Sequence, residues 1–380
     1  MSKAENKKTV FVALSGGVDS SVAALLLKKQ GYYVVGVFMR CWRDESPDAS
    51  VGVNCMEKDA EDARKVTEKL EIPFYVWNFE KEYKKKVVDY MVNGYKKGIT
   101  PNPDVMCNKE IKFGLFLEKA LKMGADYVAT GHYVRLRRKS QIPNPKSQIN
   151  PKSKIQNSLF TAKDKNKDQS YFLWTLNQEQ LKNCFFPIGD YLKSEVRKIA
   201  KKADLPTAEK KDSQGICFLG KVKLDDFLGK YIPKKKGDII NVSGEKIGEH
   251  KGSYFYTIGQ RHGLGIGGGA PYYVVEKDVK KNILKVAEGK SEALYKKEIE
   301  LTNVNFITPT PLDSLIRANG RIDLLARVRY RQALIKATLK LTNSSTVQLK
   351  FDQPVKFVAP GQSAVFYNSK GEILGGGVIK

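Results

Sequence analysis

The first 130 residues alternate between apolar runs and segments with helical character. The apolar runs predict four strands, at 9–14, 32–39, 73–79 and 125–132. The intervening segments predict three helices, at 21–29, 57–70 and 109–122. Strands that alternate with helices in this order predict an α/β domain, a parallel sheet covered on both faces. Ligands of such sheets bind beyond the carboxyl ends of the strands.

The second half of the chain has a different pattern of hydrophobic and polar residues. Helical signals return from 168 to about 210, most clearly in "KSEVRKIAKKADLP". Beyond 215 the sequence changes to short alternating segments separated by glycine-rich turns, which predict one or two small β domains, with a β-barrel at the C-terminus. The short segments are "SYFYTIG", "PYYVVEKD", "ILKVAEG", "LLARVRYR" and "STVQLKF".

These changes of pattern along the chain predict three domains. We expect an α/β domain with a helical part at 1–212, a small central β domain at 213–285 and a C-terminal β-barrel domain at 286–380. Within the first domain, "NPKSQI" is followed directly by "NPKSKI", a near-repeat that is too polar to pack. We therefore expect a flexible insertion at about 138–160.

The net charge of the chain also indicates what kind of partner the protein binds. The 380 residues contain 66 Lys and Arg against 41 Asp and Glu, a net charge of +25. A basic surface can simply be solvated, but an excess of this size favours a polyanionic partner. Nucleic acid fits better than membrane, because the sequence has no lipidation motif and its longest aliphatic run is only "VAALLL". We expect a soluble, cytoplasmic protein.

The five cysteines, at 41, 55, 107, 184 and 217, are widely spaced. The sequence has no C-x-x-C pair, so it gives little support to a structural zinc site. In the cytoplasm these side chains should be reduced thiols. Any cysteine with a functional role should act through the reactivity of its thiol.

The stretch "SGGVDS" at 15–20 lies where a strand passes into a helix. Adjacent glycines allow the backbone to approach a charged group closely, and the following helix presents free N–H groups to an anion. The turn therefore predicts a phosphate cradle with hydroxyl donors from Ser15 and Ser20, and Asp19 would bind Mg²⁺ or cap the turn. It is not a Walker A loop, and we interpret "GLGIGG" at 263–268 as a β-hairpin loop.

"SGGVDS" after a strand resembles the pyrophosphatase loop of ATP-dependent adenylating enzymes. Those enzymes cleave ATP between its α and β phosphates. They include amide-forming synthetases as well as RNA thiolases, so the loop by itself does not select the substrate.

Two cysteines lie in segments that would make their thiols reactive. Cys107 directly precedes the predicted helix, with Asn108 as its N-cap, and a helix N-terminus favours the thiolate. The alternative is a small buried residue at a helix start. Cys217 lies in a loop beside Gly215, with lysines at 210 and 211 nearby. Together with an adenylating loop, the two cysteines suggest sulfur chemistry.

Motifs along nearly the whole chain resemble those of the bacterial-type tRNA-specific 2-thiouridylases. The matching segments are "SGGVDS", "GVFMRCW", "TPNPDVMCNKEIKF", "ATGHYVR", "KDQSYFLW", "DSQGICFLG", "YTIGQRHGLGIGGGAPYYV", "RVRYR" and "PGQSAVFY". The polar insertion is the main departure, and it lies between motifs. The resemblance implies an adenine-nucleotide α-hydrolase-like first domain whose helical part binds tRNA.

The resemblance also implies a reaction. ATP adenylates the 2-carbonyl oxygen of the wobble uridine, and sulfur from a persulfide replaces it to give 2-thiouridine, AMP and pyrophosphate. Cys217 would carry the persulfide and Cys107 would be the nucleophile, leaving a disulfide that must be reduced, although Cys107 could carry the persulfide instead. The partners implied are tRNA and a persulfide donor protein, and we expect a monomer. Cysteines 41, 55 and 184 have no role in this scheme.

Site residues are implied by the same motifs. The ATP cofactor, with Mg²⁺, would be held by Met39, Gly131 and the turn Ala13, Leu14, Ser15, Gly16, Gly17, Val18, Asp19 and Ser20. Asn102, Pro103 and Asp104 would meet the target base, with Asp104 as acid/base or as a mere helix cap. Further tRNA contacts would be Lys167, Asp168, Gln169, Arg329, Tyr330, Gln362 and His132, of which His132 could instead help proton transfer.

The segment "RVRYR" also carries a prediction from its spacing alone. The arginines at 327, 329 and 331 recur with period two, which would place three guanidinium groups on one strand face. They could form a charged edge strand or contact RNA phosphates, and the net charge favours RNA.

Three other functions compete. An adenylating amide synthetase shares the "SGGVDS" loop but has no need of Cys107 and Cys217. A thiolase for another tRNA position would carry a different RNA-binding module. An RNA-binding protein without catalysis would leave both cysteine motifs unexplained.

Overall fold

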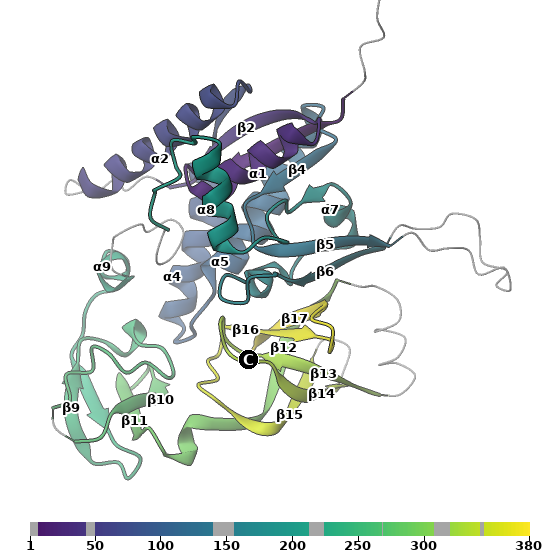
Figure 1. The fold of residues 1–380 in the computed structure, drawn as a ribbon. Coiled ribbons are helices and arrows are strands. Elements are labelled where there is room, and N and C mark those ends of the chain that lie inside the picture. The colour runs from purple at the N-terminus through teal and green to yellow at the C-terminus, as the bar shows by residue number, and fades with distance from the viewer. Residues whose placement is uncertain are drawn as a thin grey trace, which may run out of the picture.

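The computed structural model describes residues 7–42, 50–139, 156–212, 224–267, 269–307, 320–342 and 346–380. In Figure 1 the N-terminal α/β part lies above two β structures, a central sheet and a C-terminal barrel. Within the described residues, no helix has the length and apolar character needed to cross a membrane.

The N-terminal part contains a five-stranded parallel sheet of order β3-β2-β1-β4-β7. Its central strand shows why the apolar runs are continuous: Val10 and Val12 enter one core while Phe11 and Ala13 enter the other. A strand buried on both faces needs apolar residues at every position. The predicted parallel sheet is confirmed; its strands are β1 Thr9–Leu14, β2 Tyr33–Arg40, β3 Phe74–Asn78, β4 Tyr127–Thr130 and β7 Cys184–Phe185.

Helices cover both faces of this sheet. One face packs against α1 Val18–Lys29, α2 Ser50–Lys69 and α8 Lys193–Lys202. The other face packs against two helices that combine α-helical and π-helical turns. The first comprises α3 Glu80–Tyr83, η1 Lys84–Val88 and α4 Asp89–Lys96, and the second α5 Pro103–Met106, η2 Cys107–Phe116 and α6 Leu117–Lys122.

A two-stranded antiparallel ribbon, β5 Val134–Lys139 and β6 Gln156–Thr161, extends from the sheet. Its edges correct the predicted insertion at 138–160, because 138–139 and 156–160 pair as strand residues. The Arg138 guanidinium also packs over the Tyr127 and Phe185 rings, 5.1 and 4.9 Å from their centroids. The remaining insertion residues, 140–155, lie outside the described residues.

The central part contains a four-stranded sheet of order β10-β11-β8-β9. Its elements are α9 Leu224–Gly229, β8 Gly237–Ile240, β9 Lys246–His250, β10 Tyr272–Asp278 and β11 Ile283–Glu288. "SYFYTIG" is not a strand but a short turn, η4 Ser253–Phe255, followed by loop. The N–H of Ser253 donates to the Asn282 side chain at 3.1 Å instead of a strand partner. Residues 263–267 are also loop, but β10 pairs with the later strand β11, so the hairpin prediction was wrong.

The C-terminal part is a closed six-stranded barrel of order β12-β15-β14-β13-β16-β17, which confirms the predicted barrel. Its elements are η5 Glu292–Leu294, β12 Tyr295–Phe306, β13 Arg321–Arg327, β14 Ile335–Leu341, β15 Val347–Lys356, β16 Ser363–Tyr367 and β17 Ile373–Ile379.

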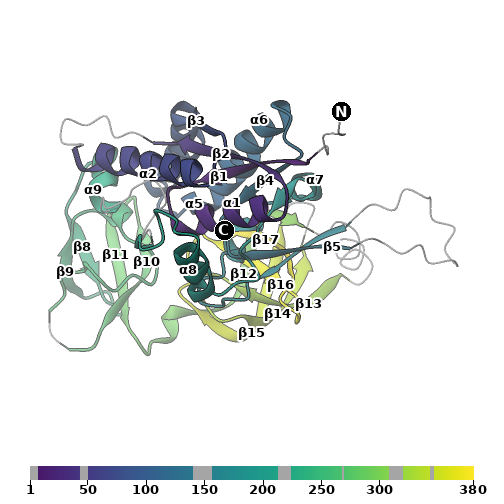
Figure 2. The same cartoon turned by 45° about the horizontal axis from the view of Figure 1, so that its top comes forward.

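The barrel lies against the helical part of the N-terminal region, η3 Ser170–Leu173 and α7 Gln178–Lys182 (Figure 2). Trp174 Nε1 donates to Ser363 Oγ at 3.0 Å, and the Tyr171 hydroxyl donates to the Ser363 carbonyl at 2.8 Å. These contacts are buried, so they fix the barrel relative to the sheet.

Candidate active site

The turn between β1 and α1 has the conformation of an anion cradle. Gly16 has φ +70°, and a Cβ there would lie 2.2 Å from the Asp59 carbonyl oxygen of α2. Gly17 is the N-cap of α1 and supplies no capping side chain. The N–H groups of the first helical turn are therefore not capped by a side chain at that position, and they can bind an anion.

The serines of this turn mainly fix its shape. Ser20 is 3% exposed; its hydroxyl accepts from the Ser15 N–H at 3.1 Å and donates to the Gly17 carbonyl at 3.2 Å. Ser21 donates to the same carbonyl at 2.8 Å. Ser15 is exposed, so its hydroxyl is the one open to a ligand.

Two further residues that the sequence predicted to bind the nucleotide lie at the same sheet edge. Gly131 follows β4, and a Cβ there would lie 2.6 Å from the backbone nitrogen of Ser20. Met39 is half-buried near the end of β2, the strand beside β1. The carboxyl ends of three adjacent strands thus contribute to one site, as expected for a ligand of a parallel sheet.

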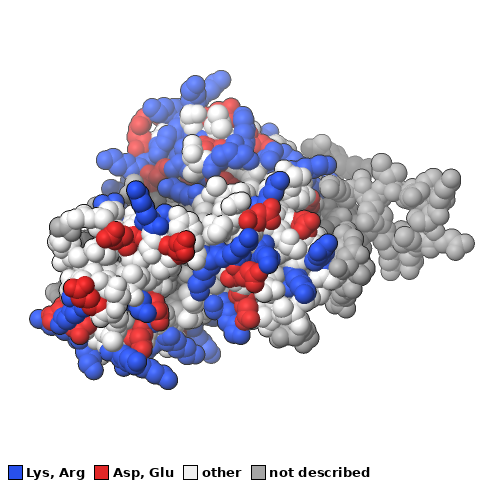
Figure 3. Space-filling view, turned by 90° about the horizontal axis from the view of Figure 1, so that it is seen from below, with Lys and Arg blue, Asp and Glu red and all other residues white. Residues whose placement is uncertain are grey.

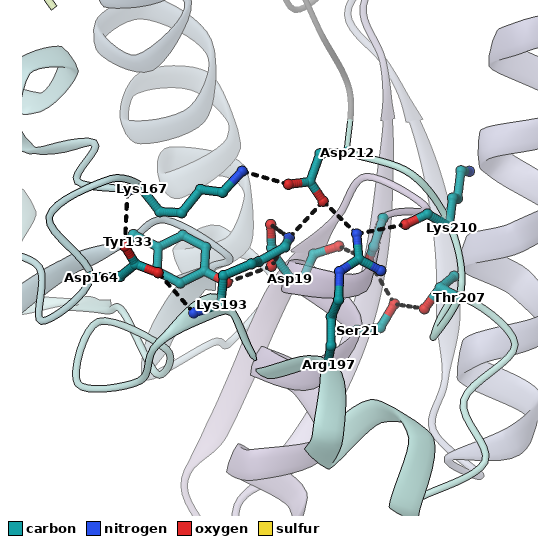
Figure 4. A network of polar contacts seen from close by, with 12 residues as sticks. Asp19, Ser21, Tyr133, Asp164, Lys167, Lys193, Arg197, Thr207, Lys210 and Asp212 are labelled. Atoms are coloured by element: carbon teal, nitrogen blue, oxygen red, sulfur yellow. Dashed lines mark hydrogen bonds and ion pairs between the residues drawn. The ribbon is translucent and has the colours of Figure 1, made fainter. Parts of the chain in front are cut away.

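Asp19 does not cap the turn, because its carboxylate is bound by other residues. Its carboxylate contacts Lys193 Nζ at 2.7 and 2.8 Å and accepts from the Tyr133 hydroxyl at 2.8 Å (Figure 4). Within the described ranges, no group of three acidic, histidine or cysteine side chains could hold a metal ion.

Lys193 belongs to an ionic network that the sequence analysis missed. Its Nζ also contacts Asp212 Oδ1 at 2.8 Å, and its side chain is only 12% exposed. Lys167 and Arg197 donate to the same carboxylate at 2.6 and 2.8 Å (Figure 4). These partners are far apart in sequence, so no local pattern marks them.

The segment 207–212 is held against the phosphate turn. The Thr207 hydroxyl donates to Ser21 Oγ at 3.0 Å (Figure 4), and Lys210 pairs with Asp59 at 2.6 Å. The residues that precede the Cys217 segment are therefore fixed to α1 and α2 in the folded protein.

The network predicts an acid-sensitive contribution to stability. Partial burial opposes ionisation of Asp212, but hydrogen bonds from Lys167 and Lys193 outweigh it and lower its pKa to about 2. A lowered pKa stabilises the fold above the unfolded pKa, near 4, and this stabilisation is lost as the pH falls toward 2. We expect Asp212→Asn to lower the free energy of unfolding at pH 7 by about 1–2 kcal/mol, allowing for partial exposure.

Denaturant unfolding between pH 7 and pH 2 measures this effect. Asp204→Asn is the matched control, because its ion pair with Lys69 is on the surface, with the Asp204 side chain 89% exposed. The interpretation fails if the two variants have the same pH dependence.

Cys107 lies inside a helix, which corrects the prediction that it precedes one. The helix begins at Pro103, and the side chain of Asn102 caps it by accepting from the Val105 N–H at 3.2 Å. Asn108 is instead 3% exposed and donates to the Phe172 carbonyl at 3.2 Å. Because the helix dipole acts mainly within the first turn, its effect on the Cys107 thiol is weaker than predicted.

The same geometry excludes the capping role considered for Asp104, and its role as acid/base stays a prediction. Asp104 is the second residue of the helix, and Asn102 supplies the cap. Asn102, and not Asp104, therefore caps the helix. The Asp104 carboxylate lies one turn before Cys107 and is half-buried. Cys107 itself is 4% exposed.

The remaining cysteines separate into two groups. Cys184 is fully buried and donates to the Gln180 carbonyl at 3.0 Å, and burial raises the pKa of its thiol. Cys41 is half-buried at the end of β2. Cys217 and the side chain of Cys55 lie outside the described residues, so the pairing of Cys107 with Cys217 stays a prediction.

Several residues predicted to contact tRNA are buried in the protein. His132 is 7% exposed and hydrogen-bonds to Thr130 Oγ1 at 2.8 Å, and burial lowers its pKa well below the ordinary value. Asp168 is 5% exposed and pairs with Arg327 at 2.7 Å. Gln169 accepts from the Tyr133 N–H at 3.0 Å. His132 and Asp168 thus already have partners within the folded protein, and their contact with tRNA stays a prediction.

The predicted arginine face of "RVRYR" does not form. Strand β13 ends at Arg327, and Arg331 has φ +66°, which is incompatible with an extended strand. Arg329 donates to the carbonyls of Phe357 and Ile258. The Tyr330 ring packs on Phe172, with ring centroids 4.5 Å apart. Long-range contacts within the protein thus use groups that the spacing assigned to RNA.

A basic cavity of about 670 Å³ lies between the N-terminal part and the barrel. Its cationic lining includes Lys165, Lys167, Arg331 and Lys370. Basic side chains are also spread over the face shown in Figure 3, with acidic groups among them. The cavity can accept a polyanion, and Lys165 and Lys370 were not recognised in the sequence.

Models of three protein families together match almost the whole chain. They are described as the tRNA methyl transferase HUP domain at 8–221, the tRNA methyl transferase PRC-barrel domain at 225–288 and the aminomethyltransferase beta-barrel domain at 296–379.

Among solved structures, U34-tRNA thiolase NcsA from Methanococcus maripaludis is 18% identical, with a TM-score of 0.34 over 60% of this chain and 69% of that one. NMN synthetase from Francisella tularensis is 16% identical, with a TM-score of 0.33 over 59% and 73%. These scores are too low to distinguish between the two activities.

Curated relatives are much more similar. The tRNA-specific 2-thiouridylase MnmA of Bacillus velezensis is 48% identical over 381 aligned residues, covering 100% of this chain and 96% of the relative. The enzyme of the same name from Staphylococcus epidermidis is 46% identical over 372 residues, covering 97% and 94%. With similarity at this level from end to end, the chain belongs to the tRNA-specific 2-thiouridylase family.

Proposed function

We propose that this protein is an ATP-dependent tRNA-uridine 2-sulfurtransferase. It adenylates the 2-carbonyl oxygen of the wobble uridine and then replaces that oxygen with sulfur, giving 2-thiouridine, AMP and pyrophosphate. The observation that carries this proposal is the full-length similarity at 48% identity to a 2-thiouridylase. The glycine turn and the Cys107 helix, both in one domain, supply the two chemistries that the reaction needs.

The nucleotide would bind at the carboxyl edge of the sheet. The turn at 13–20 would hold the phosphates through its backbone N–H groups, with Met39 and Gly131 beside the adenosine. Lys193 neutralises Asp19 and so keeps this carboxylate from repelling the phosphates. We propose that Mg²⁺ arrives with the nucleotide, because this cation is usually bound through substrate phosphates and only one or two carboxylates.

The target base would meet the segment Asn102, Pro103 and Asp104. Asp104 would act as acid/base while the 2-oxygen attacks the α phosphate and pyrophosphate leaves. Adenylation matters because it turns a poor leaving group, the carbonyl oxygen, into AMP.

Sulfur would then arrive from a persulfide on Cys217, loaded by a donor protein. The Cys107 thiolate attacks the inner sulfur of this persulfide, forming the Cys107–Cys217 disulfide and releasing hydrosulfide. The hydrosulfide attacks C2 of the activated uridine, AMP departs with the oxygen, and a thiol reductant restores both cysteines. Cys107 carrying the persulfide is an alternative route to the same product.

We also propose that the protein acts as a monomer in the cytoplasm and comprises domains at 1–212, 213–285 and 286–380. The proposal is tested by incubating the full chain with ATP, Mg²⁺, unmodified tRNA and a persulfide donor. Mass spectrometry of the tRNA should find 2-thiouridine, formed in equal amount to AMP. Formation of AMP that requires ammonia and not tRNA would instead identify an amide synthetase.

The basic cavity predicts how tRNA binding depends on salt. Removing one phosphate contact should weaken tRNA binding and reduce the slope of log Kd against log salt by about one. We expect this result for Arg331→Gln and for Lys370→Gln, both in the cavity lining. Lys122→Gln is the matched control, because Lys122 is 73% exposed and pairs with Glu118 on α6. If both variants have the same slope of log Kd against log salt as Lys122→Gln, the cavity is not part of the tRNA-binding surface.

A further inference from the structure

A turn of the barrel holds the segment that leads into the Cys107 helix. Gln362 Nε2 donates to the carbonyls of Thr100 and Pro101, at 2.9 and 3.4 Å. The Thr100 N–H donates to the Pro360 carbonyl at 2.8 Å. Backbone and side chain of the barrel turn therefore bind consecutive residues of this segment.

The turn is itself rigid and fits closely. Gly361 has φ +89°, and a Cβ there would lie 3.0 Å from the Thr100 backbone. Backbone hydrogen bonds of 2.8 Å join Gly361 and Gln362 to Ile379 of β17. The Gln362 amide is thus presented to the segment from a fixed backbone.

The segment is also held from its other side. The Thr100 hydroxyl donates to Thr257 Oγ1 of the central part at 3.3 Å. Pro101 packs so closely on Gly94 of α4 that a Cβ at Gly94 would lie 2.7 Å from the proline ring. All three parts of the fold therefore meet at residues 100–101.

The candidate catalytic helix begins directly after this segment. Asn102 is the next residue and caps the helix, and Asp104 and Cys107 lie in its first five residues. A shift of 100–101 would move the cap, and with it both reactive side chains.

We propose that Gln362 is a positioning residue that fixes the start of the Cys107 helix through its hydrogen bonds to Thr100 and Pro101. This role rests on the proposed function and replaces the tRNA contact expected for Gln362. Its amide donor is already used within the protein, and its side chain is only half-exposed. Through this residue the barrel does more than bind RNA, because it holds the reactive helix in place.

The test compares Gln362→Met, which keeps the side-chain volume and loses the donor, with Gln362→Lys, which restores a donor. For Gln362→Met we expect kcat for tRNA thiolation to fall about tenfold, with the Kd for tRNA unchanged, since small displacements of reacting groups cost rate. We expect Cys107, buried in the wild type, to be alkylated by iodoacetamide about tenfold faster as the helix start opens locally. Gln362→Lys should recover part of both losses.

Gln348→Met is the matched control, because Gln348 is on barrel strand β15 and its side-chain amide donates to the exposed carboxylate of Glu298 at 3.2 Å, away from residues 100–101. Peptide mass spectrometry measures alkylation of Cys107 in the full chain without any turnover. This readout stays informative even if the proposed reaction is wrong. The inference is overturned if Gln362→Met raises the Kd for tRNA while leaving kcat and Cys107 alkylation at the control's values.

Discussion

Replacing Cys107 by serine is expected to abolish thiolation of tRNA. The side chain is nearly isosteric, but a hydroxyl cannot attack a persulfide at neutral pH as a thiolate can. We expect a loss on the order of 10³-fold or more, as for removal of an enzyme nucleophile. tRNA binding should be retained, because Cys107 is 4% exposed and offers little surface to RNA. Mass spectrometry of the tRNA product measures the effect.

Cys184→Ser is the matched control for this substitution. Cys184 is also a buried thiol in the same domain, but it lies on β7 and bonds to the Gln180 carbonyl, a contact that serine can keep. This variant should retain thiolation. Cys217→Ser should be as inactive as Cys107→Ser, whereas only Cys107→Ser should accumulate a persulfide on the other cysteine. Sulfur incorporation by Cys107→Ser at the control's rate would contradict the two-cysteine scheme.

The sequence predicted best those features that depend on local pattern. The continuous apolar run of β1 implied a strand buried on both faces, and Val10 and Phe11 indeed enter opposite cores. The glycine pair implied a tight turn between strand and helix, and Gly16 has φ +70° at this position. In both cases the cause of the structure lies within a few residues.

Most failures have the opposite cause, because they depend on segments that are distant in sequence. Arg327 was assigned to RNA by its spacing, but its partner Asp168 lies 159 residues away in sequence. The cap of the Cys107 helix was misplaced because Asn102 and Asn108 are both good N-cap residues, and Pro103 after Asn102 was the stronger signal. Burial against distant segments, as for His132, cannot be read from single-residue motifs.

Substituting alanine for Gly16 is expected to abolish ATP use. Alanine is strained at φ +70°, and its Cβ would lie 2.2 Å from the Asp59 carbonyl oxygen, a backbone atom that cannot move without α2. The turn must therefore change conformation, which removes the N–H groups from the positions that hold phosphate. We expect AMP formation to fall by about 10²-fold or more, because catalysis requires reacting groups placed within about 1 Å.

Gly31→Ala is the control that separates the effect of backbone strain from the effect of a steric clash. Gly31 follows the other end of the same helix with φ +89°, and a Cβ there would meet nothing within 4 Å. It should therefore carry a conformational cost of about 1 kcal/mol without distorting the phosphate turn. Calorimetric titration with ATP should detect wild-type affinity in Gly31→Ala and none in Gly16→Ala. Equal ATP affinity in the two variants would mean that the turn at 15–20 does not hold the nucleotide, since only the obstruction at Gly16 distinguishes them.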